Sequence, residues 1–316
     1  MTGKANTKLG VIFRPEQPPE NLPAYARRAE EAGFDELWFW EDCFLAGGIA
    51  SAAGALANTE TIAVGAGILP AVVRNTVFAA MEIATLARLY PGRFLPGFGH
   101  GVAGWMRQVG AFPGSQLAAL EEIAGSVRAM LAGERLTLDG REVQLQDVSL
   151  VHPPDPAPPV FLGVRGPKSL ALSGRVSDGT ILAEYAAPAY ITWAREQIVK
   201  GKAEAGHDRE QRLTVFALAC AREIKAEAHE AVRPVMAGAV YPGYVDAQLA
   251  PLGILPGVKA LRERSATVEE FATAMPVSWI EQLAVAGTPD DWEKAIGRLA
   301  NAGADAVVLV PAPGKG

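Results

Sequence analysis

The sequence predicts an α/β protein whose parallel strands close into a barrel. Runs rich in Val, Ile, Phe and Leu alternate with Ala-rich helical segments along nearly all of the 316 residues, a pattern typical of a parallel sheet with helical crossovers. Residues 29–35 (AEEAGFD) resemble residues 299–305 (LANAGAD), each ahead of a strand-like run. This is either a common αβ joint or true repetition, and repetition supports barrel closure. With 49% apolar and 20% charged residues the chain can bury a large core, so we expect one domain over residues 1–316.

The strands and helices are expected to alternate in chain order. The strands are placed at about 8–14, 35–40, 61–69, 93–98, 159–164, 179–183, 213–220 and 306–310. The helices are placed at about 22–31, 48–57, 77–90, 116–131, 167–174, 188–202, 226–236 and 289–302. Parallel strands need such crossover helices, because a tight turn cannot join them.

Two segments interrupt the alternation. Residues 136–145 (LTLDGREVQL) place a DG pair between alternating apolar positions, so we expect an inserted hairpin at about 134–150. The proline-rich run PPDPAPP at 153–159 then returns the chain to the barrel as an extended linker. Residues at about 240–287 predict short helices before the last long helix, which we interpret as a lid-like insertion or an oligomer surface.

Composition argues against several classes of function. The net charge of −6 and a sequence pI near 5.4 give no basic stripe for nucleic acid. Cys43 and Cys220 are far apart, which supports neither a disulfide framework nor a zinc site and fits a reducing cytoplasm, and no motif resembles a metal cluster. The start MTGKANTKLG lacks a signal-type apolar segment, and no run of about 18 apolar residues occurs. We therefore expect a cytoplasmic protein that binds no nucleic acid or membrane.

Two loops after neighbouring strands are suited to close approach by a ligand. The third strand runs into Gly67-Ile68-Leu69 and then a proline, where regular pairing must end. The fourth strand ends in Gly99-His100-Gly101, where glycines let the backbone approach a planar or charged group and His100 can titrate. Ligands of parallel α/β proteins bind at the carboxyl ends of strands, where both loops fall. His100 is therefore a candidate catalytic residue.

Carboxylates follow other predicted strands. The second strand ends in WFWEDCF, which places Asp42 at its carboxyl end as a functional group or, alternatively, as a loop-ordering residue. Cys43 is interpreted as a wall residue rather than a nucleophile, because no histidine is near it in the sequence. Glu184 ends the sixth strand, and Arg14 with Glu16 ends the first, where a general acid or a substrate clamp can stand. Asp42 and Glu184 are further candidate catalytic residues.

The turn Arg165-Gly166-Pro167-Lys168-Ser169 follows the fifth strand and opens a helix. Free backbone N–H groups and the helix dipole make such a turn a candidate anion site, for which a cofactor phosphate is the natural occupant. The alternative is an ordinary helix start whose basic residues lie in solvent. Neither a G-x-G-x-x-G after the first strand nor a Walker motif occurs, so a Rossmann domain and a P-loop are not supported.

The chain resembles the bacterial luciferase-like flavin-dependent oxidoreductases, particularly the branch that uses the deazaflavin coenzyme F420. The resemblance is carried by GILPAVVRNTVFAAMEIATLARLYPGRFLPGFGHG, GVRGPKSLALSGRVSDGTIL and AGTPDDWEKAIGRLANAGADAVVLV, with AEEAGFDELWFWED near the start. It spans nearly the whole chain. It implies a TIM (β/α)8 barrel with insertion segments at the C-terminal face, holding the cofactor ring at the carboxyl ends of the strands.

The resemblance also implies site residues. A non-prolyl cis peptide in a bulge behind the ring is expected at Gly67-Ile68, next to Leu69, and Asp42 is expected beside the cofactor. Gly99, His100 and Gly101 are expected along the edge of the ring. The cofactor phosphate is expected at the turn made by Gly163, Val164, Arg165, Gly166 and Pro167.

The chain departs from one branch of this family at two positions. Sugar-phosphate dehydrogenases have a histidine after the aspartate and a glutamate after the glycine loop, whereas this chain has Cys43 and Val102. The departure argues against that dehydrogenation. A methylene-tetrahydropterin-type reductase, or reduction of an activated double bond, needs less acid–base machinery and stays open.

The resemblance leaves three functions to distinguish. The first is an F420-dependent oxidoreductase that transfers a hydride between the cofactor and a small organic substrate. The second is an FMN-dependent monooxygenase that takes reduced flavin from a flavin reductase and activates oxygen. The third is a non-catalytic flavin-binding homologue. A homodimer is also expected by resemblance.

Overall fold

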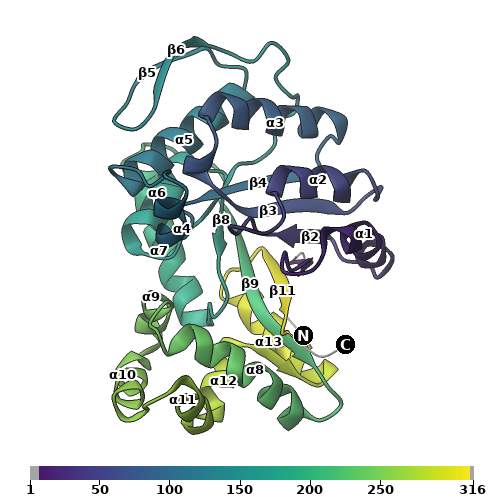
Figure 1. The fold of residues 1–316 in the computed structure, drawn as a ribbon, viewed down its shortest axis with the longest axis vertical. Helices are drawn as coiled ribbons and strands as arrows, with labels where there is room; N and C mark the ends of the chain where they lie inside the picture. The colour runs from purple at the N-terminus through teal and green to yellow at the C-terminus, as the bar shows by residue number, and fades with distance from the viewer. Residues whose placement is uncertain (1–6, 314–316) are drawn as a thin grey trace.

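A computed structural model describes residues 7–313 and shows a closed parallel barrel surrounded by helices (Figure 1). The ring of strands runs β1-β2-β3-β4-β7-β8-β9-β11, and it closes because β8 pairs with β9 and β11 pairs with β1. The bounds are β1 Lys8–Ile12, β2 Glu36–Phe39, β3 Ala63–Pro70, β4 Phe94–Gly99, β7 Phe161–Gly163, β8 Gly179–Leu182, β9 Arg212–Ala221 and β11 Ala306–Pro311. All eight predicted strands form within the described residues, so the predicted barrel is confirmed.

The crossover helices cover the outside of this barrel. Their bounds are α1 Leu22–Glu31, α2 Gly48–Leu56, α3 Thr76–Leu89, α5 Gln116–Leu131, α6 Pro167–Val176, α7 Pro188–Glu204 and α13 Pro289–Asn301. Each buries one face; α1, for example, buries Leu22, Ala26 and Ala29, at the spacing of one helical stripe. Among the helices of residues 7–313, none is long and apolar enough to cross a bilayer. Residues 1–6, which belong to the segment predicted to carry no signal, lie outside the described residues.

The joint that the sequence repeats before β2 and β11 is built twice in the same way. Gly33 and Gly303 both take positive φ, 81° and 116°, and each turns the chain out of a helix. The aspartate that follows then holds a neighbouring strand: Asp35 accepts the N–H of Leu9 at 2.9 Å, and Asp305 accepts the N–H of Leu213 at 2.8 Å. The short aspartate thus ties adjacent strands together at the N-terminal face of the barrel.

Large side chains fill the interior of the barrel, and glycines on β3 make room for them. The inner cluster consists of Ile12, Trp38, Leu95, Phe161, Ile181, Phe216, Val308 and Val310. A Cβ on Gly65 would lie 2.1 Å from the Trp38 ring, and one on Gly67 would lie 2.8 Å from Phe216. The interior is therefore a packed core beneath the mouth, as in other barrels of this class.

The predicted hairpin forms from β5 (Leu136–Asp139) and β6 (Gln144–Val148), at the top of Figure 1. One carboxylate anchors it: Glu122 on α5 accepts the backbone N–H groups of Arg141, Glu142 and Val143 at 2.8–2.9 Å. These hydrogen bonds favour the ionised form, so the pKa of Glu122 is lowered although burial opposes this.

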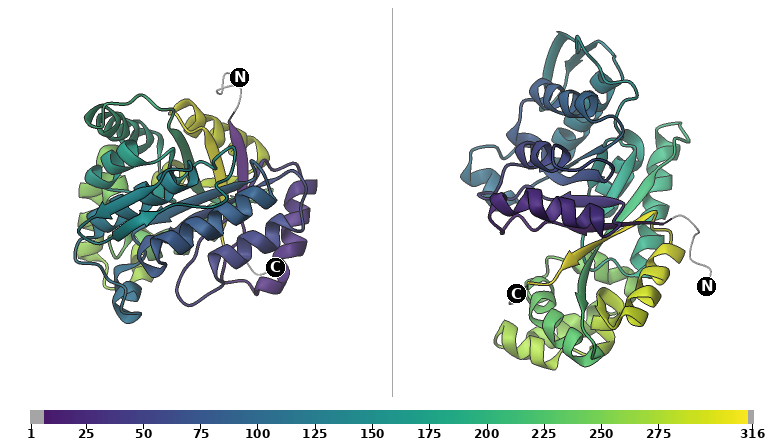
Figure 2. Two further views of the ribbon diagram at one scale, coloured as in Figure 1. Left: turned by 90° about the horizontal axis from the view of Figure 1, so that it is seen from above. Right: turned by 90° about the vertical axis from the view of Figure 1, so that its right-hand side faces the viewer.

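The predicted insertion folds as a lobe with its own core on one side of the barrel (Figure 2). The lobe includes α8 (Lys225–Val240), which was predicted at about 226–236 as a crossover helix outside the insertion. The insertion itself adds α9 Asp246–Leu249, α10 Leu255–Arg264, α11 Val268–Ala274 and α12 Val277–Leu283. A short strand that the sequence did not indicate, β10 (Val285–Gly287), pairs with β9 beyond the point where β8 ends. The C-terminal half of β9 therefore belongs to the barrel and to the lobe at once.

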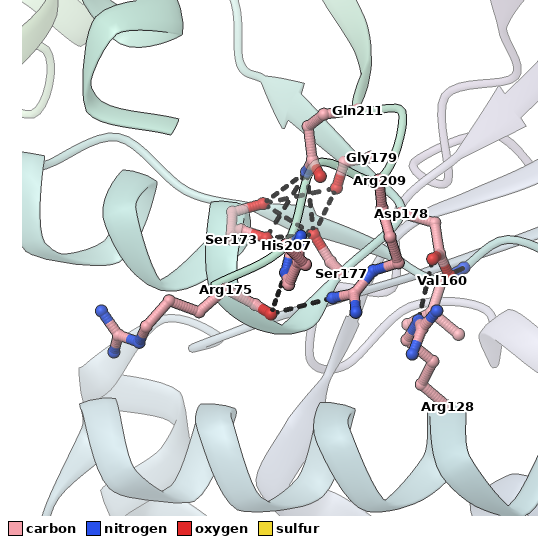
Figure 3. Close-up of polar contacts among 10 residues, drawn as sticks. All are labelled: Arg128, Val160, Ser173, Arg175, Ser177, Asp178, Gly179, His207, Arg209 and Gln211. Atoms are coloured by element: carbon pink, nitrogen blue, oxygen red, sulfur yellow. Dashed lines mark hydrogen bonds and ion pairs between the residues drawn. The ribbon is translucent and has the colours of Figure 1, made fainter. Parts of the chain in front are cut away.

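A buried polar network lies at the N-terminal face of the barrel, at the end opposite the carboxyl ends of the strands (Figure 3). Ser173 and Ser177 at the end of α6 meet Thr180 on β8, with Ser173 Oγ 2.7 Å from Thr180 Oγ1. The side-chain amide of Gln211 donates to Ser177 Oγ at 3.1 Å and Thr180 Oγ1 at 3.2 Å. Buried hydroxyls need such partners, and polar groups at this end of a barrel serve stability rather than ligand binding.

Candidate active site

The carboxyl end of β3 carries the bulge that the resemblance predicts. The pairing of β3 with β4 shifts register between Ala66 and Leu69, and the Gly67–Ile68 peptide is cis. The Ile68 side chain lies across the next two strands of the ring, β4 and β7: a Cβ on Gly99 would be 2.8 Å from Ile68 Cγ1, and one on Gly163 would be 2.3 Å from Ile68 Cγ2. Gly99 and Gly163 are thus required by packing. The half-buried Ile68 presents an apolar seat at the barrel mouth.

Two of the predicted cofactor residues can contribute only their main chain. Leu69 is 1% exposed and points to the outer core, where its Cδ2 would lie 2.4 Å from a Cβ on Gly48. Val164 is likewise buried in the outer core, beyond the end of β7. For Leu69 the sequence does not reveal this, because the bulge in β3 changes which side chains face the mouth.

The glycine loop after β4 places His100 beside the predicted anion turn. Gly101 takes φ of 68°, which favours glycine, and Val102 precedes a short helix that the sequence did not indicate, α4 (Ala103–Gln108). His100 Nε2 lies 3.2 Å from Ser169 Oγ, whereas its Nδ1 is buried and makes no regular hydrogen bond within residues 7–313. Burial lowers the pKa of His100, and the main chain of Gln116 raises it by less. The lowered pKa keeps the ring neutral at pH 7.

The turn between β7 and α6 has the features of an anion site. Gly166 is the extended N-cap residue and Pro167 occupies the first turn, and the cap position offers no side-chain acceptor to the first N–H groups of α6. Tyr190 fixes the turn by donating its hydroxyl to the Arg165 carbonyl at 2.8 Å. The Arg165 guanidinium donates to the Tyr244 carbonyl of the lobe at 3.1 Å. Unpaired N–H groups at a helix N-terminus bind phosphate well.

Carboxylates gather where β1, β2 and β8 end. Burial, and next the charge of Glu16, raise the pKa of Asp42 to about 6; Trp40 opposes the shift by hydrogen bonding, and the charge of Glu184 adds to it. Arg14 pairs with Glu16 at 2.7 Å and lies over the Trp40 ring. Asp42 can therefore hold a proton close to neutral pH, which an ordinary aspartate cannot.

Glu41, adjacent to Asp42, has a different role. Its two carboxylate oxygens each accept a hydrogen bond from Arg74 at 2.6 Å, and one of them also accepts the N–H of Gly48 at 2.6 Å. This bidentate pair orders the loop between β2 and α2. Of the two acidic residues after β2, Glu41 is structural and Asp42 faces the acidic group at the mouth.

Sequence reasoning missed three groups that touch this site. Ser169 contacts His100, Trp40 contacts Asp42, and Gln248 of the lobe holds the turn that carries Glu184. Ser169 lay within a turn already marked as a helix start, but nothing in the sequence pairs it with a residue 69 positions away. Within residues 7–313 no group of three or more His, Cys, Asp or Glu side chains is arranged to hold a metal ion.

Comparison with known proteins gives consistent results. The profile of the luciferase-like monooxygenases matches residues 4–306. The 5,10-methylenetetrahydromethanopterin reductase of Methanolobus tindarius is 31% identical over 307 residues, which cover 95% of this chain and 93% of that protein. The F420-dependent glucose-6-phosphate dehydrogenase of Beutenbergia cavernae is 33% identical, but over only 55% of this chain and 56% of that protein. The solved F420-dependent tetrahydromethanopterin reductase of Methanopyrus kandleri superposes with a TM-score of 0.82 at 23% identity, covering 97% of this chain and 93% of that one.

Proposed function

Because this chain belongs to the luciferase-like monooxygenase family, we propose that it is a coenzyme F420-dependent oxidoreductase that transfers a hydride between the cofactor and a small organic substrate. One relative that matches along nearly the whole chain is a 5,10-methylenetetrahydromethanopterin reductase, and one matching solved structure is named as a coenzyme F420-dependent tetrahydromethanopterin reductase. The observation that carries the proposal is the combination of the Ile68 seat with the unpaired N-terminus of α6.

The residues present fit a deazaflavin with a phosphate-bearing tail. Ile68 offers an apolar surface for a planar ring, and Gly67 and Leu69 offer main-chain groups beside it. The first turn of α6, with Gly166 and Pro167, offers N–H groups to a phosphate. When bound, F420 supplies a ring carbon that gives or takes a hydride.

The chain's own residues supply orientation and proton handling. Asp42 holds or releases a proton at its carboxyl near neutral pH, since its pKa is about 6. Glu184 contributes negative charge to the same mouth, and the neutral His100 lies beside Ser169 in the first turn of α6. We assign these three residues as the catalytic group.

The reductase-type reaction is favoured over sugar-phosphate oxidation. The chain has Cys43 and Val102 where the sugar-phosphate branch has its histidine and glutamate. Val102 precedes α4 as its N-cap residue and is 49% exposed, and its apolar side chain cannot donate a proton in place of that acid. The glucose-6-phosphate dehydrogenase relatives also match only about half of the chain, 55%.

Cofactor binding tests the proposal directly. Oxidised F420 and FMN are titrated into the protein and followed by fluorescence. We expect F420 to bind at micromolar concentration and FMN more weakly. Tight FMN binding without F420 binding overturns the proposal in favour of the FMN-dependent monooxygenase, which requires a flavin reductase as partner. Turnover of reduced F420 with any acceptor excludes a non-catalytic homologue.

We also propose a homodimer that forms through α3. Phe78, Met81 and Leu89 lie along its outer face and are 63%, 47% and 66% exposed. Their spacing makes one apolar stripe, and the adjoining α2 has small residues (GIASAAGAL) that allow close approach of a second copy. Light scattering is expected to give twice the chain mass for the wild type and the chain mass for Phe78→Glu.

We further propose that the protein works in a reducing cytoplasm. Cys43 and Cys220 both carry free thiols, which accords with a reducing cytoplasm.

A further inference from the structure

The turn after β8 places Glu184 directly before a residue with a constrained backbone conformation. β8 ends at Leu182, and Tyr185 takes φ of 72°, in the left-handed region that residues with a Cβ rarely adopt. Such a conformation persists only where the surroundings enforce it. The direction in which the Glu184 side chain leaves the backbone therefore depends on what holds this turn.

Gln248 is the group that holds it. This glutamine lies on α9 in the lobe and is 0% exposed. Its side-chain amide nitrogen donates to the Ala183 carbonyl at 3.1 Å and to the Glu184 carbonyl at 2.6 Å. Its Oε1 is buried without a regular hydrogen bond within residues 7–313. Burying an amide with one unpaired oxygen is unfavourable, and the two hydrogen bonds to the turn offset part of this cost.

The segment that carries Gln248 is itself held by two arginines on its N-terminal side. Arg262 on α10 donates to both carboxylate oxygens of Asp246, at 2.5 and 3.0 Å, and also to the Val240 carbonyl. The Tyr244 carbonyl accepts from Arg165, in the anion turn. Residues 244–248 therefore touch the β7 turn and the β8 turn together, and bring the lobe to the edge of the site.

We propose that Gln248 is a positioning residue that fixes Glu184 at the barrel mouth, so that the lobe completes the acidic group made by Asp42, Glu16 and Glu184. The role of that group in hydride transfer rests on the proposed function. The placement of Glu184 by Gln248 does not, and it can be measured without cofactor.

The first experiment uses the ligand-free protein. Aspartate carboxyl carbons are labelled with 13C, and the Asp42 midpoint is measured by NMR in the wild type, Glu184→Gln, Gln248→Met and Ser265→Ala. Because the charge of Glu184 raises the pKa of Asp42, we expect both Glu184→Gln and Gln248→Met to lower the midpoint below its wild-type value of about 6. Ser265→Ala removes a buried hydrogen bond to Leu261 in the same lobe without touching the turn, so it leaves the midpoint unchanged.

The second experiment is a double-mutant cycle on turnover. Gln248→Met is expected to lower kcat about tenfold and to leave the F420 dissociation constant within about twofold, and to have no further effect in a Glu184→Gln background. If Gln248→Met fails to fold, Gln248→Asn, which keeps a shorter amide, should move both readouts in the same direction.

The outcomes separate the two proposals. An Asp42 midpoint that moves in Glu184→Gln but not in the Gln248 variant overturns the positioning role, and so does an undiminished effect of Gln248→Met in the Glu184→Gln background. A wild-type protein that binds no F420, but whose midpoint shifts as expected, overturns the proposed function and retains Gln248 as the positioning residue.

Discussion

At the residue scale, the raised pKa of Asp42 serves the proposed proton transfer but lowers the stability of the folded protein at neutral pH. Its folded pKa of about 6 lies above the ordinary value of 3.8. Below about pH 4 the carboxyl is protonated in the folded and unfolded chains alike and costs nothing. Between pH 4 and 6 the folded protein keeps a proton that the unfolded chain releases, so the free energy of unfolding falls as pH rises, and the loss is complete above about pH 6.

Asp42→Asn should therefore stabilise the protein while it impairs turnover. We expect the free energy of unfolding at pH 7 to rise by roughly 1–3 kcal/mol, with no gain at pH 4, because the variant has no charge to bury. Urea denaturation from pH 4 to 8 measures this. A difference from wild type that stays constant with pH would show that the carboxyl is not the cause. Turnover should fall about tenfold or more, since the variant cannot donate a proton.

His100 is expected to act through the anion turn. His100→Ala removes the partner of Ser169 and leaves the first turn of α6 less ordered, so cofactor binding or turnover should weaken by at least about tenfold, or about 1.4 kcal/mol. Ser169→Ala is the matched variant, because it breaks the same contact from the other side. F420 affinity and turnover that are unchanged in both variants would remove this pair from the site.

At the element scale, the bulge in β3 depends on glycines in two other strands. A Cβ on Gly163 would lie 2.3 Å from Ile68 Cγ2, so Gly163→Ala should displace Ile68, lower the free energy of unfolding by about 1–3 kcal/mol and weaken F420 binding. In an Ile68→Ala background the stability cost of Gly163→Ala should fall by more than half. Gly125→Ala, where the added Cβ meets nothing within 4 Å, is the control. An equal cost in both backgrounds contradicts this account.

Most helices and strands were predictable, because the spacing of apolar residues and the residues that end a helix are signals carried by neighbouring positions in the sequence. α1 and α5 match their expected bounds, Leu22–Glu31 and Gln116–Leu131, since each has a clear start and a glycine or proline punctuation nearby. The short elements α4 and β10 were not predicted. α4 follows a glycine loop in only six residues, and β10 has three residues, too few for any periodicity to show.

At the scale of the whole molecule, the sequence predicts that the site lies at the carboxyl ends of the strands. It does not predict which of the residues there are structural and which face the site. Asp42 and Glu41 are neighbours in one motif, yet only Arg74, 33 positions away from Glu41, decides that Glu41 is structural. Gln248 contacts the Glu184 turn from 64 positions away in a lobe whose helices follow no repeating pattern. Such pairings arise from topology, so a single sequence gives no local signal for them.

The lobe and the barrel are expected to unfold together, because β9 contributes side chains to three hydrophobic cores. Phe216 points into the barrel interior, Leu213 and Val215 pack under the outer helices, and Leu218 and Cys220 belong to the lobe core. Losing the lobe therefore exposes the C-terminal half of a central barrel strand. Calorimetry should show one transition, with calorimetric and van't Hoff enthalpies in agreement.

Two core variants sharpen this last test. Phe271→Ala in the lobe and Leu162→Ala in the barrel each empty a fully buried site and should cost about 2–5 kcal/mol. Both should move the same single transition to lower temperature. If Phe271→Ala splits off an early transition and leaves the barrel transition in place, the lobe folds as a separate unit. In that case the lobe can move away from the mouth without disturbing the barrel, as a lid does. If the lobe unfolds only together with the barrel, it forms a fixed side of the site.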